Sequence, residues 1–433
     1  MPFETSALAQ KTIAVVGAGI SGMGAAYKLS QNHRVVLFES EDRLGGHART
    51  RLAGPNADCA VDTGFIVFNY ANYPNLADLF DELEVPVVES NMSFGASIDG
   101  GRLEYGLAGF GALFAQKRNM LNPQFLRMCR DIFHFNAHAL ETSQDPNLTV
   151  GALIQKLGLG SWFRDYYLAP LSGAIWSTPV EKIMDFPARA MIQFFENHAL
   201  LHHSGQHQWY TVNGGSREYV SRLENAMSQR GVDIRLGTAV QAVRRDVLGI
   251  EIKTWGGEWE RFDEVVFATH SDDTLALLAD PSPDEKSVLG AISYQPNSIV
   301  LHSDASIMPQ SRKVWSSWVY TEDKDKPSDR IDLTYWMNSL QPWLRRDDFF
   351  VTLNSTRPID EKLIWDEVTL RHPVYDQKAL AAQNAARQLN GTNRTWFCGA
   401  WMKHGFHEDG LASALDVVRG IDLSEANVGV AAE

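Results

Sequence analysis

The stretch Thr12–Gly24, which reads TIAVVGAGISGMG, decides the first part of the fold. Thr12–Val16 is a short apolar run rich in β-branched residues, a pattern typical of a buried parallel strand. Gly17, Gly19 and Gly22 follow with the G-x-G-x-x-G spacing, and good helix formers come next. The first glycine permits a tight turn, the second lets the backbone approach a pyrophosphate, and the third lets helix and strand pack closely. The stretch therefore predicts a strand, a phosphate-binding turn and a helix.

Two features downstream favour a dinucleotide site over an ordinary turn without a ligand. A second strand-like run, Arg34–Phe38, is closed by Glu39, where a carboxylate would accept hydrogen bonds from ribose hydroxyls and disfavour a 2′-phosphate. The segment Arg43–Thr50, RLGGHART, then adds a second glycine pair. A nicotinamide site does not need this pair, whereas a longer ligand lying over the chain does.

The motifs GAGISGMGAAYKL, Glu39 and RLGGHART together resemble the flavin amine oxidase and carotenoid desaturase superfamily, whose members bind FAD. The resemblance covers essentially the whole chain. It implies an α/β fold in which a Rossmann-like FAD-binding domain is interleaved with a substrate domain of mixed sheet plus helices. The implied FAD-binding domain comprises residues 1–70, 208–290 and 388–433, and the substrate domain comprises residues 71–207 and 291–387.

The resemblance also implies which residues contact the cofactor. A strand with an Asp-x-Gly would lie against the flavin ring, and a closing helix with Asp409 as its N-cap would point amides at the ring. Two positions depart from the family pattern, since His47 replaces an Arg and Ala400 replaces a Glu. We expect Cys398 to pack as a small buried side chain, so the FAD is predicted to be noncovalent. The implied cofactor-binding residues are Gly17, Gly19, Ser21, Gly22, Glu39, Ser40, Arg43, Gly45, Gly46, His47, Asp62, Gly64, Phe65, Ile66, Val240, Gly399, Ala400, His407, Asp409, Gly410 and Leu411.

The substrate is less sharply defined by the resemblance. Flavin amine oxidases frame the substrate nitrogen with two aromatic side chains, often Tyr, and place a Lys beside the flavin. Here Phe406 stands at one of those aromatic positions, and the strand expected to carry the Lys, Gln295–Ser303, has none. Stretches such as YQPNSIVLHSD and WFCGAWMKHGFHEDGL instead look like a bacterial subgroup found with cyclopropane-fatty-acid-synthase-like methyltransferases. That subgroup includes desaturases of methylated fatty acyl chains in furan fatty acid synthesis.

Three functions therefore stay open: a lipid acyl desaturase, an amine oxidase, and a non-catalytic flavin-binding partner of a lipid methyltransferase. The predicted catalytic residues are His302, His404 and His407, with His372 as a further ionisable group. His302 could act as a neutral base or be a hydrogen-bonded core histidine that bridges two strands. The predicted substrate-pocket residues are Trp336, Tyr375, Trp401 and Phe406.

Composition excludes several classes of protein. A formal net charge of −14 argues against a nucleic-acid binder, and no apolar run reaches the ~20 residues of a spanning helix. Three widely spaced cysteines and no secretory signal pattern predict a cytoplasmic protein without disulfides. No second G-x-G-x-x-G occurs, so oxygen, a quinone or a protein is the expected electron acceptor. The histidines at 198, 202, 203 and 207 indicate hydrogen-bonded side chains of a cleft rather than zinc ligands, so no metal is predicted.

The segment Tyr105–Arg118, YGLAGFGALFAQKR, allows two interpretations. It is either part of the core with a solvated basic end, or an interfacial segment on a membrane with anionic headgroups. In the second case the protein would be peripheral on the inner face of the membrane. Its lipid contacts would be Leu107, Phe110, Leu113 and Phe114, with Lys117 and Arg118 facing phosphates.

Overall fold

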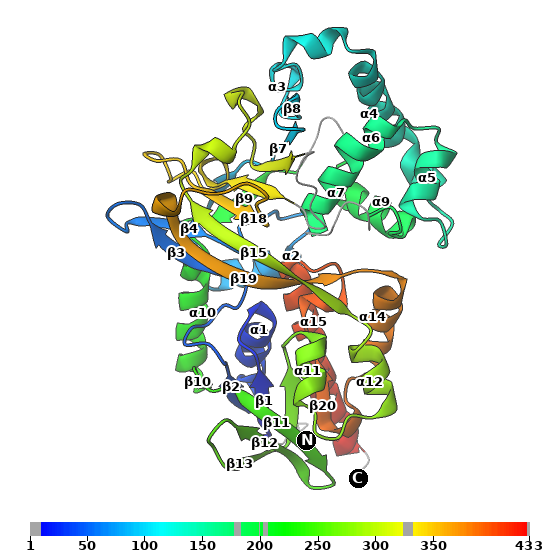
Figure 1. The fold of residues 1–433 in the computed structure, drawn as a ribbon. Helices are drawn as coiled ribbons and strands as arrows, with labels where there is room; N and C mark the ends of the chain where they lie inside the picture. Colours follow the sequence, from blue (N-terminus) through cyan, green and yellow to red (C-terminus); the bar gives the residue numbers. More distant parts are fainter. Residues whose placement is uncertain (1–9, 177–182, 199, 202–206, 324–331, 431–433) are drawn as a thin grey trace, which may run out of the picture.

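The computed structural model describes residues 10–176, 183–198, 200–201, 207–323 and 332–430. Its first layer is a five-stranded parallel sheet with the strand order β10-β2-β1-β14-β20, drawn in the lower half of Figure 1. The quoted motif forms the central strand, which pairs in parallel with β2 and β14. The five strands are β1 (Thr12–Val16), β2 (Arg34–Phe38), β10 (Asp233–Arg235), β14 (Glu264–Phe267) and β20 (Thr395–Phe397).

Both faces of this sheet are covered, which explains why β1 is apolar throughout. Ile13 and Val15 pack with the helices of one face, and Ala14 and Val16 pack with the elements of the other. The first face carries α1 (Ile20–Leu29), α2 (Pro74–Glu82), α10 (Arg217–Gln229) and α15 (His407–Val430). The second carries β11 (Val240–Asp246), β12 (Gly249–Thr254), β13 (Trp259–Phe262), α11 (Ser271–Leu277), α12 (Pro283–Leu289) and α14 (Gln377–Leu389).

A seven-stranded mixed sheet lies above the first one in Figure 1. Its pairs are antiparallel except that β16 runs parallel to β7. In sheet order, the strands are β19 (Ile364–Val374), β15 (Ser293–His302), β18 (Phe350–Leu353), β17 (Leu333–Trp336), β16 (Trp318–Glu322), β7 (Phe94–Ile98) and β8 (Leu103–Gly106). All of these strands come from the segments predicted for the substrate domain.

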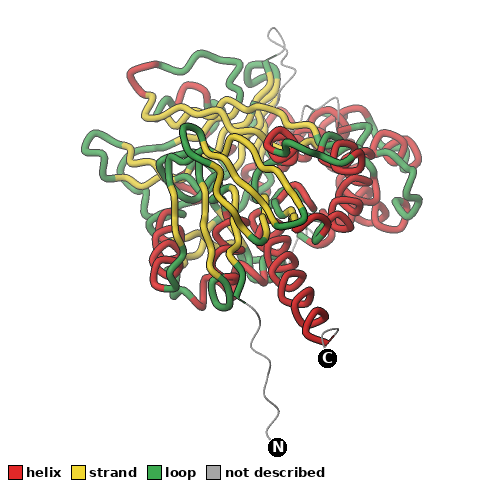
Figure 2. The backbone as a smooth tube through the Cα atoms, turned by 90° about the horizontal axis from the view of Figure 1, so that it is seen from below, coloured by secondary structure: helices red, strands yellow, loops and turns green. Residues whose placement is uncertain are grey.

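Helices gather beside the seven-stranded sheet, as Figures 1 and 2 show from two directions. They share a hydrophobic core with it, centred on buried aromatic side chains such as Phe125, Phe135 and Phe163. These helices are α3 (Phe110–Leu113), α4 (Pro123–Thr142), α5 (Val150–Lys156), α6 (Ser161–Phe163), α7 (Ala169–Trp176), α9 (Ala188–Asn197) and α13 (Met337–Leu340), with a 3₁₀ turn, η1 (Lys117–Leu121), between α3 and α4.

Two small sheets join the layers. The hairpin of β3 (Thr50–Ala53) and β4 (Cys59–Asp62) leaves the dinucleotide motif, and β5, β9 and β6 form a three-stranded sheet. The last three strands are Val67–Phe68, Trp209–Val212 and Val87–Ser90. Among the described residues no helix combines the length and the apolar character needed to cross a bilayer.

Candidate functional site

One large cavity, of about 1450 Å³, extends from the dinucleotide motif to the seven-stranded sheet. At one end it is lined by the turn after β1 and by the residues that follow β14. At the other end it is lined by side chains of β15, β17 and β18, including Ile299, Tyr335 and Val351. The cavity thus connects the carboxyl edge of a parallel sheet, where ligands bind in such folds, with the second core.

The glycines of the motif have the geometry that a dinucleotide phosphate requires. A Cβ on Gly22 would lie 1.7 Å from the carbonyl oxygen of Gly17, so this position must stay bare for helix and strand to meet. A Cβ on Gly19 would meet no atom within 4 Å, and Gly19 lines the cavity. Its backbone is therefore open to a close-lying phosphate at the start of α1.

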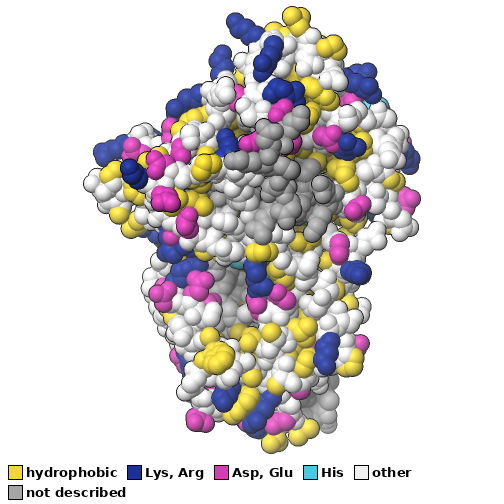
Figure 3. All heavy atoms as spheres, in the orientation of Figure 1, with side chains coloured by type: hydrophobic (Ala, Val, Ile, Leu, Met, Phe, Trp, Pro, Cys, Tyr) yellow, Lys and Arg dark blue, Asp and Glu magenta, His cyan; other side chains and the backbone are white. Residues whose placement is uncertain are grey.

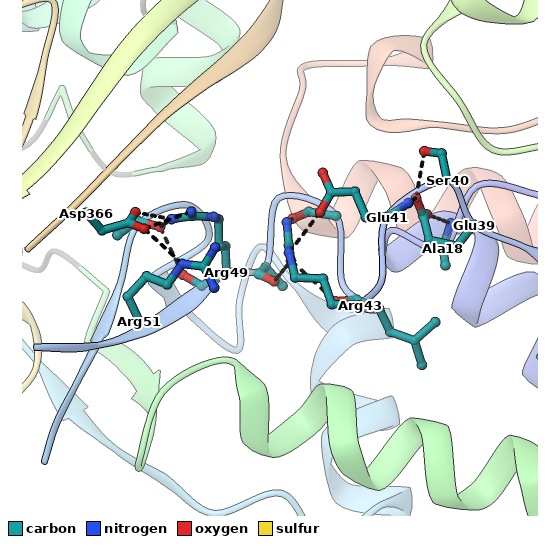
Figure 4. Close-up of polar contacts among 12 residues, drawn as sticks. Ala18, Glu39, Ser40, Glu41, Arg43, Arg49, Arg51 and Asp366 are labelled. Carbon is teal, nitrogen blue, oxygen red and sulfur yellow. Dashed lines mark hydrogen bonds and ion pairs between the residues drawn. The ribbon is translucent and has the colours of Figure 1, made fainter. Parts of the chain in front are cut away.

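Glu39 lies at the cavity wall directly after β2 (Figure 4). Its Oε2 accepts a hydrogen bond from the Ala18 N–H at 2.7 Å, and its Oε1 accepts one from the Glu41 N–H at 2.9 Å. The carboxylate therefore ties the second strand to the glycine turn while facing the position predicted for a ribose. These residues fit the adenosine diphosphate half of FAD.

Arg43 was predicted to contact the cofactor, and the structure places it elsewhere. Its guanidinium donates to the carbonyl oxygens of Leu44, Gly46 and Ala48 and pairs with Glu41 at 2.9 Å (Figure 4). It shapes the second glycine loop from the side away from the cavity. In the same view Arg49 and Arg51 both pair with Asp366 of β19, which fastens the β3–β4 hairpin to the seven-stranded sheet.

Three histidines come together on the cavity wall. The ring centroid of His47 lies 5.8 Å from that of His270 and 5.7 Å from that of His372. Burial lowers the pKa of His47, and it lowers the pKa of His270 and of His372 to about 3, so all three rings are neutral at pH 7. Sequence reasoning could not group these histidines, because they come from three distant segments.

His407 lies at the centre of a second set of rings. It stacks on Phe65 with centroids 3.9 Å apart, and its Nε2 lies 2.9 Å from the hydroxyl of Tyr219. Burial lowers its pKa to about 3 and also lowers the pKa of His404, which lines the same cavity. Two of the three predicted catalytic histidines therefore face the cavity as neutral imidazoles.

The third predicted catalytic residue, His302, does not face the cavity, so that prediction is corrected. Its ring is fully buried, with Nε2 2.8 Å from the hydroxyl of Thr352 and the ring packed beside Phe350. Along β15, Ile299 lines the cavity, and a strand turns successive side chains to opposite faces. His302 lies on the other face, as the bridging core histidine that was the alternative interpretation.

The prediction that Trp336 lines the substrate pocket is also corrected, because this residue lies on the face of the sheet that is turned away from the cavity. Its neighbour Tyr335 lines the cavity, whereas Trp336 packs against Trp315 on the opposite face and donates through Nε1 to Asp348 at 3.0 Å. The other predicted pocket residues, Tyr375, Trp401 and Phe406, do line the cavity.

Several predicted cofactor residues do not line the cavity and instead form hydrogen bonds among the elements that surround it. Asp62 is buried and accepts hydrogen bonds from Thr50, Ser216 and Gln341. Asp409 is not an N-cap, because α15 already begins at His407; its Oδ2 accepts from the backbone N–H groups of His404 and Phe406.

Gly410 and Leu411 also lie away from the cavity wall. Gly410 packs on Ser21, and Leu411 fills the space left by Gly24, so both fasten α15 to α1. The predicted cofactor residues that do line the cavity are Gly17, Gly19, Ser21, Glu39, Ser40, Gly45, Gly46, His47, Gly64, Phe65, Ile66, Val240, Gly399, Ala400 and His407.

The part of the cavity farther from the motif is mainly apolar, and the polar residues Asn91, Ser93 and Asn136 also line the cavity. Among the described residues that line the cavity, the only acids are Glu39, at the ribose end, and Asp273, which pairs with Arg371 beside the histidine cluster. No signal in the sequence located this part, because its side chains come from many elements. They include Met92, Leu107, Leu113, Ile132, Phe133, Tyr167, Leu171, Ile175, Phe194, Ile299, Trp318, Tyr335, Val351 and Leu370.

The predicted absence of a zinc site concerned four histidines, of which His202 and His203 lie outside the described residues. His198 lines the cavity, and its Nδ1 lies 2.9 Å from the carbonyl oxygen of Phe194. In the described part of the chain, one set of potential metal ligands lies close together, His270, Asp272 and Asp273. Both of its carboxylates pair with Arg371, so this set is accounted for by an ion pair.

Comparison with known proteins agrees with this geometry. The family model described as flavin containing amine oxidoreductase matches residues 20–303. The chain belongs to this family. Membership confirms the expected cofactor, FAD, and the expected class of enzyme, an FAD-dependent oxidoreductase. The chain is also 36% identical over 98 residues to the FAD-dependent oxidoreductase dbaF of Emericella nidulans, a match that spans 22% of this chain and 20% of that relative.

Solved structures share the fold along nearly the whole chain. A CLA-producing fatty acid isomerase from P. acnes superposes with a TM-score of 0.66 at 13% identity, over 94% of this chain and 98% of the isomerase. Cyclohexylamine oxidase from Brevibacterium oxydans superposes with a TM-score of 0.66 at 13% identity, over 95% and 100% of the two chains. The predicted α/β class with an FAD-binding fold is confirmed.

Proposed function

We propose that this flavoprotein dehydrogenates a lipid, namely a methylated fatty acyl chain of a phospholipid. The observation that carries the proposal is the apolar half of the cavity, which is continuous with the dinucleotide end. An extended acyl chain presents apolar surface along its whole length, and burying that surface supplies binding energy. Bound FAD supplies the acceptor for the hydride.

The chain's own residues would orient the acyl chain and receive a proton. Tyr375 and Phe406 line the cavity beside the closing loop, where they can hold the reacting carbons against the flavin end. His404 lies on the same loop, and its lowered pKa leaves the ring neutral at pH 7, so a ring nitrogen can accept a proton. A lipid methyltransferase that methylates the acyl chain is the proposed partner, since its product is this substrate.

An amine substrate fits the cavity less well. Amines are cationic at pH 7, and a buried cation without a carboxylate partner loses hydration energy that aromatic rings replace only in part. Of the acids on the described wall, Glu39 faces the ribose end and Asp273 is already paired with Arg371. The likeness to cyclohexylamine oxidase is a likeness of fold, and the fold is shared by a fatty acid isomerase as well.

The test is anaerobic mixing of the FAD-loaded protein with phospholipids that carry methylated monounsaturated acyl chains. We expect the flavin absorbance to bleach and mass spectrometry to show a product two hydrogens lighter. Unmethylated phospholipids and a panel of amines are the controls. Bleaching by amines alone would contradict the proposal, and a flavin that no donor bleaches would favour the non-catalytic role.

A cavity-filling variant makes the test specific to the apolar half. Met92 lines that half and is only partly buried, so Met92→Trp narrows it without disturbing the glycine motif. We expect wild-type FAD content and at least tenfold slower flavin reduction by the lipid, because one misplaced bulky group displaces the reacting carbons. An unchanged rate would place the acyl chain elsewhere.

A further inference from the structure

Residues 107–140 combine exposed apolar and basic side chains on a protein that is strongly acidic overall. The exposed fractions are 72% for Phe110, 87% for Leu121, 44% for Leu126 and 61% for Phe133. The same segment contains four basic residues and one acid, although the whole protein has a formal charge of −14. We call the exposed side chains of residues 107–140 the entrance face.

The entrance face borders the place where the apolar half of the cavity reaches solvent. Leu107, just before α3, and Phe133, on α4, both line the cavity, and their side chains are 38% and 61% exposed. A residue that is open to solvent and also lines the cavity marks an opening. Any substrate that enters here passes between α3 and α4.

The basic side chains of the face point outward. Lys117 and Arg118 are exposed on η1, and Arg127 and Arg130 on α4 are 58% and 70% exposed. The single acid, Asp131, is buried: its Oδ2 accepts from the Gly160 N–H at 2.9 Å, and its carboxylate pairs with the two arginines of α4. The net outward charge is therefore positive. Hydrophobic and basic side chains can be followed at the upper end of the molecule in Figure 3.

We propose that the entrance face docks on an anionic lipid bilayer and delivers acyl chains directly into the cavity. Phe110 and Leu121 would enter the boundary of the acyl region, and the basic side chains would lie at the phosphates. A face that exposes both apolar side chains and cations matches such a surface, whereas the rest of this acidic protein is repelled by it. The docking proposal rests on the proposed function, because a lipid substrate is the reason for docking. The exposure and the charge of the entrance face do not depend on that substrate.

This assignment revises the interfacial segment expected from sequence. Of the four lipid contacts expected from sequence, Leu113 and Phe114 are half-buried against the core, so the proposed face does not depend on them. Phe110 does face outward, and α4 supplies the second half of the face.

The test is co-sedimentation of the FAD-loaded protein with vesicles of phosphatidylcholine, with or without phosphatidylglycerol. We expect binding to the anionic vesicles that weakens as salt rises, and little binding to the neutral ones. The variant Phe110→Ser/Leu121→Ser should bind the anionic vesicles at least about tenfold more weakly. Neither residue lines the cavity, so flavin content and flavin reduction by detergent-solubilised lipid should be unchanged.

The matched control is Val247→Ser/Leu248→Ser, which removes two apolar side chains, 90% and 71% exposed, from the turn between β11 and β12. It should bind vesicles as the wild type does. Equal loss in both variants, or no binding of the wild type to anionic vesicles, would overturn the proposal. A wild-type dimer that becomes a monomer in the Phe110→Ser/Leu121→Ser variant would instead identify a second copy as the occupant. Failure of the detergent-solubilised reaction in the wild type would refute the proposed function and leave docking to be judged by sedimentation.

Discussion

At the scale of single residues, the carboxylate of Glu39 has two roles, one in the glycine turn and one in cofactor binding. Its carboxylate holds the Ala18 N–H at 2.7 Å and faces the ribose position. We expect Glu39→Gln to weaken FAD binding by about 1.5–3 kcal/mol, because hydrogen bonds to a charged acceptor become bonds to a neutral amide. Flavin retention after extensive dialysis measures the loss.

Asp42→Asn is the control for this substitution, since Asp42 is an exposed carboxylate three residues away that does not line the cavity. It should retain FAD as the wild type does. Equal flavin retention in Glu39→Gln and the wild type would remove Glu39 from the binding site.

At the scale of elements, the two faces of the seven-stranded sheet have different tasks. Ile299, Tyr335 and Val351 project into the cavity, and His302, Trp336 and Phe350 project to the opposite face. The alternation of a strand decides this assignment for all of them at once. Side chains of the first face can contact a substrate, whereas side chains of the second face stabilise the fold.

His302→Asn tests this division. The hydroxyl of Thr352 loses one of its two partners and keeps the hydroxyl of Thr334, and a cavity forms, so the free energy of unfolding should fall by about 1–3 kcal/mol. The rate of anaerobic flavin reduction should stay within about twofold, because the ring does not reach the cavity. Urea denaturation and stopped-flow absorbance measure the two quantities.

His404→Asn is the counterpart on the cavity wall. If His404 receives the proton, this variant should slow flavin reduction by roughly 10²–10⁴-fold with little change in stability. A slow His302→Asn variant beside a fast His404→Asn variant would reverse the assignment.

At the scale of the whole molecule, the buried histidines make the apoprotein sensitive to acid. Burial lowers the pKa of His270, His372 and His407 to about 3, and that of His198 and His302 to about 4. In the unfolded chain each pKa is about 6.5, so below that pH the unfolded state binds more protons than the folded state. Asp62 opposes this trend, because burial raises its pKa to about 6.

The expected outcome is a free energy of unfolding that is nearly constant between about pH 6.5 and about pH 8 and falls as the pH drops toward 3. The loss is at most about 1.4 kcal/mol per histidine for each pH unit. Urea denaturation of the apoprotein at several pH values measures it. A midpoint that does not change between pH 7 and pH 5 would mean that these rings are hydrated or already charged.

The sequence by itself determined the parallel sheet, the phosphate turn and the acidic residue after β2. Those features follow from local rules: an apolar β-branched run, glycines where a side chain would collide, and a fixed spacing along one βαβ unit. The need for a glycine at position 22 could be predicted from sequence, because the backbone atom that a side chain there would collide with belongs to Gly17, five residues earlier.

Only the tertiary structure decided which side chains meet in the cavity. His302 and Ile299 belong to one strand, and nothing local says which face of that strand meets the cavity, because both faces of the sheet are covered. His47, His270 and His372 come from three segments that only the packing of two sheets brings together. The opening between α3 and α4 arises in the same way, since exposure depends on what the rest of the chain leaves uncovered.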